Sequence, residues 1–142
     1  MPRGHVPPDL RRLVSERASG CCEYCCSQEK YAPQRFSIEH IKPRALGGPT
    51  IESNLAFSCQ GCNSHKAERI RAPDPLTGLE SPLFNPREQA SGEHFVWSDD
   101  YTLVEGLTPT GRATVVALKL NREGLVNIRW ALYSILEHPP AT

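Results

Sequence analysis

The motifs Cys22-Glu23-Tyr24-Cys25 and Cys59-Gln60-Gly61-Cys62 decide the fold of this chain, and 33 residues separate them. Two residues between paired cysteines allow a tight turn to aim both sulfurs at one ion. Two such turns complete the tetrahedron that zinc prefers. This closed site leaves no open coordination position, so the predicted zinc is structural and adds directly to the folding free energy. The other thiols, Cys21 and Cys26, have four residues between them and are expected to pack or to stay free.

Length and composition limit the class of protein. With 142 residues the chain forms one compact domain or a small module with an appendage, and 39% hydrophobic residues predict a modest core. No apolar run approaches the roughly 18 residues of a membrane span, and the first residues lack the hydrophobic stretch of a signal peptide. We therefore expect a cytoplasmic protein without membrane contact, in which grouped cysteines bind metal rather than form the disulfides of a secreted chain.

Periodicity and turn residues divide the first half of the chain into helices, strands and a loop. We expect a helix over 9–20, strands over 36–41 and 55–58, a Pro- and Gly-rich loop over 42–54, and a mostly solvated helix over 61–71. Asp9 is the expected N-cap of the first helix, because a short acceptor side chain there satisfies free backbone N–H groups. Phe36 and Ile38 alternate with polar residues, which indicates a strand with one buried face.

The second half reads as a connector followed by a small extension. Residues 73–93 are rich in Pro and Gly and are expected to connect without a core of their own. Beyond them we expect a hairpin of 95–97 and 101–107 that turns at 98–100, a helix over 111–120 capped by Thr110, and a last helix capped by Asn121. The predicted organisation is a core over 9–72, the connector, and an extension over 94–138 packed on or beside the core.

The residues that carry chemistry lie between and just after the cysteine motifs. Glu39 and His40 are neighbours at the end of a predicted strand, so their side chains point to opposite sides. One can bind a metal while the other meets a water. Asn63 directly follows the second motif, which fixes it in the first turn of a helix, where its carbonyl oxygen can reach the same ion. Oxygen and amide ligands with open positions suit Mg²⁺ or Mn²⁺.

The order and spacing of these motifs resemble the HNH endonuclease family, and more narrowly bacterial HNH proteins with paired CxxC zinc ligands. The matching residues are Glu39-His40-Ile41-x-Pro43-Arg44-x-x-Gly47-Gly48, Asn54-Leu55 and Cys59-x-x-Cys62-Asn63-x-x-Lys66. The resemblance implies an α+β fold whose centre is a treble-clef ββα-metal finger with a structural zinc. The N-terminal helix and the C-terminal hairpin and helices would be added to this finger.

The resemblance also implies a role for each motif residue. His40 is then the general base that takes a proton from a water attacking phosphorus. Glu39 and Asn63 hold a catalytic Mg²⁺ or Mn²⁺, although the family usually has Asp at the first position. Asn54 holds the loop that orients His40. The implied activity is metal-dependent hydrolysis of DNA phosphodiester bonds, in which the ion stabilises charge on the scissile phosphate and on the leaving 3′ oxygen.

Basic residues around the motifs are candidate phosphate contacts, and ordinary solvated residues are the alternative. They are Lys42, Arg44, His65, Lys66 and Arg69. On an ideal helix His65 points about 160° away from Asn63, so it is not expected to share the metal. Two alternatives remain for the whole chain. One is a catalytically inactive zinc-finger-type module that binds nucleic acid, and the other is an HNH nuclease directed to RNA or branched DNA.

The formal charge of zero hides an asymmetry between the two halves of the chain. Residues 1–72 carry 11 Lys and Arg against 7 Asp and Glu, whereas residues 73–142 carry 5 against 9. The basic half is expected to contact duplex DNA weakly and with strong salt dependence. The C-terminal region is expected to pack on the finger, to form a dimer or to contact a protein partner.

Overall fold

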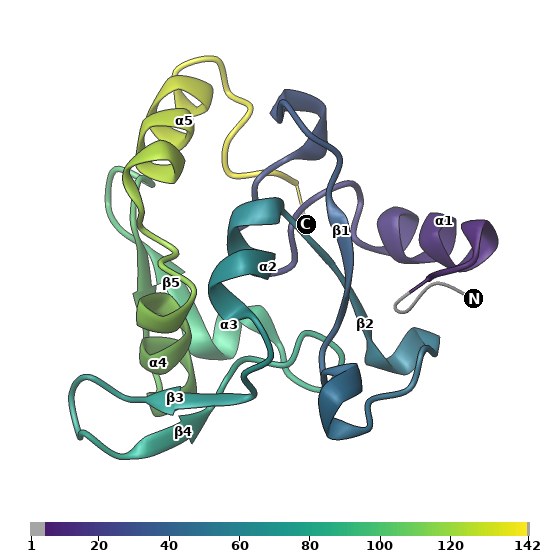
Figure 1. The fold of residues 1–142 in the computed structure, drawn as a ribbon. Helices are drawn as coiled ribbons and strands as arrows, with labels where there is room; N and C mark the ends of the chain where they lie inside the picture. The colour runs from purple at the N-terminus through teal and green to yellow at the C-terminus, as the bar shows by residue number, and fades with distance from the viewer. Residues whose placement is uncertain (1–4, 142) are drawn as a thin grey trace.

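A computed structural model describes residues 5–141 as a mixed α+β structure built from short elements (Figure 1). The helices are α1 (Pro8–Arg17), α2 (Gln60–Lys66), α3 (Ser91–His94), α4 (Pro109–Ala117) and α5 (Glu123–Tyr133). The strands are β1 (Ser37–His40), β2 (Leu55–Ser58), β3 (Arg71–Pro73), β4 (Glu80–Pro82), β5 (Phe95–Trp97) and β6 (Val104–Gly106). Single 3₁₀ turns lie at Glu29–Tyr31, Arg44–Leu46 and Glu52–Asn54. Within the described range, consecutive strands pair as antiparallel hairpins, which confirms the predicted α+β class.

Helix α1 begins one residue earlier than predicted and ends three residues earlier. Pro8 lies in the first turn, where its missing N–H is harmless because that group has no partner inside a helix. Asp9 therefore lies within the helix and is not its N-cap, a position that Pro7 holds without a side-chain hydrogen bond. Val14 is fully buried, and α1 packs against β2.

The hairpin of β1 and β2 matches the two predicted strands closely. Ile38 pairs with Phe57, and His40 pairs with Leu55. β2 is buried along its whole length, so this strand forms the centre of the core. Residues 42–54 form the expected loop between the strands. The pairing places His40, at the end of β1, beside the first residue of β2.

Helix α2 follows β2 directly and is shorter than predicted. Cys59 is its N-cap, and the Cys59 Sγ accepts a hydrogen bond from the Cys62 N–H at 3.4 Å. The helix stops at Lys66 because Ala67 has a φ of +52°, which helical residues do not adopt. The prediction of a helix as far as residue 71 is wrong, since Arg71 begins β3 and pairs with β4 instead.

The segment predicted to be a connector is structured and contributes to the core. Asp74 closes the hairpin of β3 and β4, and its carboxylate accepts two hydrogen bonds from the Arg112 guanidinium of α4, each at 2.9 Å. Leu83 and Phe84 follow β4 and are buried. The Phe84 N–H donates to Thr114 Oγ1 of α4 at 2.9 Å. The expectation of a segment without a core is therefore wrong: its Pro and Gly residues mark turns, while its apolar residues pack against a helix far along the chain.

The C-terminal hairpin and helices are present as predicted, but their caps differ. β5 and β6 pair antiparallel around a turn at the predicted place. Thr108, not Thr110, caps α4, because its hydroxyl accepts a hydrogen bond from a first-turn backbone N–H at 3.0 Å. Asn121 does not cap α5. Its side chain bridges instead to the backbone N–H and C=O of Val104 in β6, which ties the end of α4 to the hairpin.

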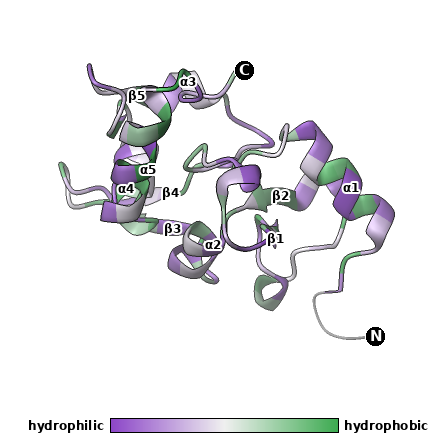
Figure 2. Ribbon diagram, turned by 90° about the horizontal axis from the view of Figure 1, so that it is seen from above, coloured by the Kyte–Doolittle hydropathy of each residue, from purple (hydrophilic) through white to green (hydrophobic). Residues whose placement is uncertain are grey.

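One buried cluster runs through these elements, from Val14 in α1 through Phe57 in β2 to Leu118 and Leu125 beside and within the last two helices. The predicted core, connector and extension therefore share a hydrophobic core. In Figures 1 and 2, α4 and α5 lie on one side of α2, and the β1–β2 hairpin with α1 lies on the other, so α2 occupies the junction. Among residues 5–141, no helix combines the length and the apolar character that crossing a membrane requires.

Candidate metal centre and active site

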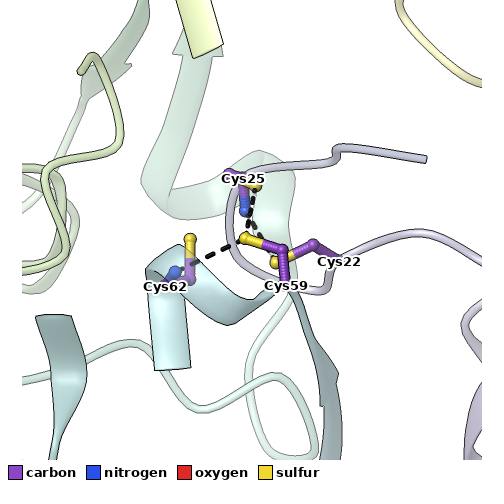
Figure 3. A group of neighbouring side chains, drawn as sticks. All are labelled: Cys22, Cys25, Cys59 and Cys62. Atoms are coloured by element: carbon purple, nitrogen blue, oxygen red, sulfur yellow. Dashed lines mark hydrogen bonds between the residues drawn. The ribbon is translucent and has the colours of Figure 1, made fainter. Parts of the chain in front are cut away.

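The four cysteines of the two motifs converge at the N-terminal end of α2 (Figure 3). Their Sγ atoms all lie within 4.8 Å of one another, and all four residues are buried. The Cys25 and Cys59 Sγ atoms are 3.6 Å apart. In a tetrahedral site with zinc–sulfur bonds of about 2.3 Å, neighbouring sulfurs are about 3.8 Å apart. The predicted grouping is therefore confirmed, and its donor set and spacing fit a tetrahedral metal ion.

Backbone groups and mutual hydrogen bonds prepare these sulfurs for a cation. The Cys25 N–H donates to Cys22 Sγ at 3.5 Å, and the Cys62 N–H makes the equivalent bond to Cys59. Burial raises the pKa of the Cys22 thiol well above its usual range. Hydrogen bonds from the other three cysteines hold the pKa of Cys59 far below its usual range. A metal ion must bind all four as thiolates, so its binding releases protons.

Cys21 and Cys26 lie outside this group, as their spacing predicts. The Cys21 Sγ is within 3.5 Å of the Ser19 carbonyl oxygen. Burial raises the pKa of Cys26 to about 12, so this thiol stays protonated at neutral pH. Neither residue is among the four that converge.

His40 ends β1 and is half-buried, with one ring nitrogen already engaged. Its Nε2 lies 2.8 Å from Thr50 Oγ1, and the same hydroxyl oxygen accepts a hydrogen bond from Arg44 Nη1 at 3.0 Å. Burial and then the positive charge of Arg44 lower the pKa of His40 below its ordinary value of 6.5. The imidazole is therefore neutral at neutral pH and is held in one orientation.

Glu39 points the other way, into the protein, and is only 5% exposed. The Tyr24 hydroxyl donates to Glu39 Oε1 at 2.6 Å, and Lys66 Nζ lies 3.5 Å from Oε2. Within the described range, Oε2 itself has no hydrogen-bond partner. Burial raises the pKa of Glu39, and the positive charge of Lys66 opposes that rise. Glu39 Oε2 therefore accepts no hydrogen bond among the described residues but forms an ion pair with Lys66.

Lys66 is buried, contrary to the expectation of a solvated side chain. Its Nζ donates to the Ile41 carbonyl oxygen at 3.0 Å, next to the Glu39 carboxylate. The expectation is wrong because the ammonium neutralises an internal acid. A direct phosphate contact would require Lys66 to leave that pair. Asn63 precedes Lys66 by three residues on α2, so both lie on the helix face that packs toward β1.

Asn63 is half-buried and borders an open depression of about 520 Å³, together with Arg35, Ser37 and Gln60. Its backbone continues α2, and the hydrogen bonds found among residues 5–141 include none from its side-chain amide. The two predicted ligands thus lie along the contact between β1 and α2. Glu39 is on the inner side of this contact, and Asn63 borders the depression.

Asn54 organises the loop beside His40. Its side-chain oxygen accepts from the Lys42 N–H at 2.9 Å, and its amide nitrogen donates to the carbonyls of Lys42 and Pro49 at 3.1 and 2.9 Å. Gly48 packs directly against this arrangement. A Cβ at residue 48 would lie 1.7 Å from the Lys42 carbonyl oxygen and 3.0 Å from Asn54 Nδ2. The loop therefore needs both the amide of Asn54 and the missing side chain of Gly48.

The other predicted phosphate contacts have different surroundings. Lys42 and Arg44 are exposed on the loop that also carries Thr50. Arg69 is exposed, but its guanidinium donates to the carbonyls of His65 and Ala117, which joins α2 to the end of α4. His65 is half-buried, and burial followed by neighbouring positive charges lowers its pKa.

Tyr24, Thr50 and Arg122 contact the site, and the sequence motifs did not reveal them. For Tyr24 the sequence held one indication of burial, since a large aromatic residue inside a metal-binding turn is expected to pack inward. Thr50 reaches His40 across 10 residues and Arg122 reaches Cys62 across 60, so no local pattern could predict these contacts.

Together these features define a small α+β domain in which a four-cysteine centre joins the turn over 22–25 to the start of α2. The hairpin between them carries a histidine and, on the opposite side of β1, a buried carboxylate. The model of the HNH endonuclease family matches residues 22–69, which include both cysteine motifs, β1, β2 and α2. Residues 22–69, about a third of the chain, therefore match an HNH endonuclease domain.

The chain is also similar to the Septu protein PtuB of Bacillus mycoides (strain KBAB4). The two are 30% identical over an alignment of 115 residues, and the match covers 63% of this chain and 39% of that protein. The chain therefore spans about two fifths of the length of this curated relative. No solved structure gives a significant match.

Gly48→Ala tests whether the packing of the loop holds the site together. We expect a loss of about 1–3 kcal/mol in the free energy of unfolding, because the new Cβ would overlap a backbone carbonyl that cannot turn away. Urea unfolding measures this loss. Gly92→Ala is the matched control, since no atom lies within 4 Å of a Cβ there. Equal stability of the two variants would contradict the described packing.

Proposed function

We propose that the chain is a metal-dependent endonuclease that hydrolyses phosphodiester bonds of duplex DNA, with His40 as its general base. The environment of His40 carries this proposal. A half-buried imidazole with a lowered pKa ends a strand within an HNH endonuclease domain, and the adjoining loop bears exposed cations. Products with 5′-phosphate and 3′-hydroxyl ends are expected.

His40 is suited to take a proton from water. Its lowered pKa keeps it in the neutral, basic form at neutral pH. Thr50 Oγ1 occupies Nε2, so a water that gives up its proton to His40 would meet Nδ1. The Thr50 oxygen, which accepts from Arg44, has a second lone pair that can accept from Nε2–H, and in that tautomer the lone pair of the ring lies on Nδ1. Thr50 is therefore proposed as a positioning residue.

Mg²⁺ or Mn²⁺ is the proposed metal of the reaction, held by Glu39 and Asn63. The proposed ligand atoms are the amide oxygen of Asn63 and the buried Oε2 of Glu39, which is paired with Lys66. Both are hard oxygen ligands, which these ions prefer. When bound, such an ion stabilises negative charge on the phosphate and on the leaving oxygen. Lys66 repels a second cation at the same carboxylate, so we expect weak metal affinity.

Zn²⁺ is the proposed occupant of the four-cysteine centre. Four sulfur ligands close the coordination shell, so this metal would be structural and the finger would have the treble-clef arrangement. Thiolates of this kind persist in reducing compartments, which supports a cytoplasmic location.

Lys42 and Arg44 are the proposed phosphate contacts, because both are exposed on the loop next to His40. RNA and branched DNA carry the same phosphates and are the alternative substrates. A second candidate function is a nucleic-acid-binding module without cleavage. It is favoured by the Glu39 carboxylate, which Tyr24 and Lys66 already engage.

The C-terminal region also offers a surface for a protein partner or for a second copy of the chain. Trp130 of α5 is 70% exposed, and Leu136 just beyond the helix is 90% exposed. Ile135 is exposed between them. Large apolar side chains exposed in one short stretch of sequence favour association where they form one patch.

His40→Ala decides between cleavage and binding. We expect nicking of supercoiled plasmid by the wild type with Mg²⁺ or Mn²⁺ and none with EDTA. The variant should be slower by roughly 10²–10⁴-fold, since it lacks the general base. Glu105→Ala, at an exposed residue of β6, should leave the rate unchanged.

The cleavage rate should fall with decreasing pH only below about pH 6.5. The reason is that the base form of His40 is lost only as the pH falls through its lowered pKa. A wild type without metal-dependent cleavage, or an unimpaired His40→Ala variant, would refute the mechanism. A panel of duplex DNA, branched DNA and RNA then separates the substrates.

Thr50→Val removes the hydroxyl at Nε2 while keeping the shape of the side chain. The cleavage rate should fall roughly 10–100-fold, because the imidazole loses its fixed orientation. Thr50→Ser should restore most of the rate. If valine and serine behave alike, the hydroxyl does not position His40.

Cys22→Ser tests the zinc proposal by metal content alone. The purified wild type should hold one zinc per chain, and the variant should lose tight binding because three thiolates leave the tetrahedron open. Cys26→Ser should keep a full equivalent. A full equivalent of tightly bound zinc in Cys22→Ser would show that the four cysteines are not the ligands.

A further inference from the structure

An arginine of the C-terminal region reaches the four-cysteine centre from the opposite half of the chain. Arg122, the N-cap residue of α5, donates through Nη2 to Cys59 Sγ at 3.4 Å and through Nη1 to Cys62 Sγ at 3.6 Å. Its Nη1 also donates to the carbonyls of Leu118 and Lys119. One guanidinium therefore joins the sulfurs at the start of α2 to the segment between α4 and α5.

A second arginine of the same helix lies beside the first cysteine motif. Arg129 is only 3% exposed and lies over the Trp97 ring. Its Nη2 contacts the carbonyl oxygens of Leu120 at 2.7 Å and Cys25 at 3.5 Å. Among residues 5–141, no carboxylate lies within salt-bridge distance of Arg122 or Arg129. A buried guanidinium without a counter-ion is strongly unfavourable, so Arg129 needs negative charge from another source, and the half-buried Arg122 is stabilised by the same charge.

The cysteine centre supplies that charge when it holds zinc. Four thiolates on one Zn²⁺ leave two net negative charges, and the two arginines carry two positive ones. Among the described residues, the two guanidinium groups have no other partner of negative charge within salt-bridge distance. The burial of Arg129 and the half-buried position of Arg122 are thus accounted for if the centre is a zinc thiolate centre.

Gly61 makes this contact with Arg122 sterically possible. A Cβ at residue 61 would lie 2.4 Å from Arg122 Nη2 and 2.8 Å from its Cζ. Gly61 lies within α2 and is not among the residues with positive φ, so the backbone itself does not require glycine. Its missing side chain is explained by the space that the guanidinium occupies.

We propose that Arg122 and Arg129 are the counter-ions of the zinc thiolate centre, and that the loaded centre docks the C-terminal helices on the HNH domain. This inference rests on the proposed zinc site and not on nuclease activity. Zinc binding and docking are then linked, so each strengthens the other by the same free energy. Loss of zinc removes the fixed negative charge that holds α5.

Arg122→Met tests the contact through the rate of zinc release to a chromogenic chelator under native conditions. We expect release roughly 10–100-fold faster than from the wild type, as for other residues that hydrogen-bond to metal ligands. Lys119→Met is the matched control, because it removes the same charge from an exposed side chain three residues away. A release rate for Arg122→Met within twofold of the control would overturn the proposal.

Gly61→Ala provides a second test that leaves Arg122 in the chain. Its Cβ should displace the guanidinium and speed zinc release to a similar extent, although alanine is the better helix former. In the double variant the second substitution should add nothing, because both remove the same contact. An unchanged rate in Gly61→Ala, or additive effects in the double variant, would contradict the contact.

Hydrogen exchange measures the docking itself. In zinc-loaded Arg122→Met, amides of residues 123–133 should exchange faster than in the wild type, while those of α1 should not change. Unchanged exchange in α5 would refute the docking role. A wild type without bound zinc would instead refute the zinc proposal, so the two failures are distinguishable.

Discussion

The convergence of four sulfur atoms on one point is the constraint on which the rest of the structure depends. One pair precedes β1 and the other opens α2, so a bound ion would close a loop that contains the whole β1–β2 hairpin. Closing this loop lowers the entropy of the unfolded chain and fixes where β1 meets α2. Because Glu39 lies on β1 and Asn63 on α2, their relative position depends on the same closure.

The C-terminal elements are part of this arrangement and not an appendage. Asp74 and Arg112 join the β3–β4 hairpin to α4, and Arg122 joins α4 and α5 to the cysteines. A chain with a modest apolar fraction therefore combines a shared core with buried charges that neutralise one another. Such charges stabilise only when each has its partner, so a metal ion at the four-cysteine centre would change the stability of the fold.

The contact between β1 and α2 is where stability and the proposed chemistry compete. Lys66 neutralises the buried Glu39 carboxylate and thereby stabilises the fold without metal. The same ammonium opposes a divalent cation at that carboxylate. The Lys66 ammonium does not affect His40 in this way, because His40 lies on the other side of the strand and is held by Thr50. The histidine thus has a fixed orientation, whereas metal binding at the proposed ligand Glu39 would require the ion pair with Lys66 to rearrange.

The sequence alone determined the features that depend on spacing along the chain. The paired cysteines, β1, β2 and the loop around Asn54 follow from short-range patterns, because a tight turn or a strand needs only neighbouring residues. Tertiary structure decided what depends on distant partners. It shortened α2, gave the Pro- and Gly-rich segment a place in the core, and turned Lys66 inward to Glu39. It also set Arg122 against sulfurs 60 residues away. A charged side chain can be buried only where the fold brings an opposite charge near it. Because that partner is distant in sequence, no local pattern predicts which charged residues are buried.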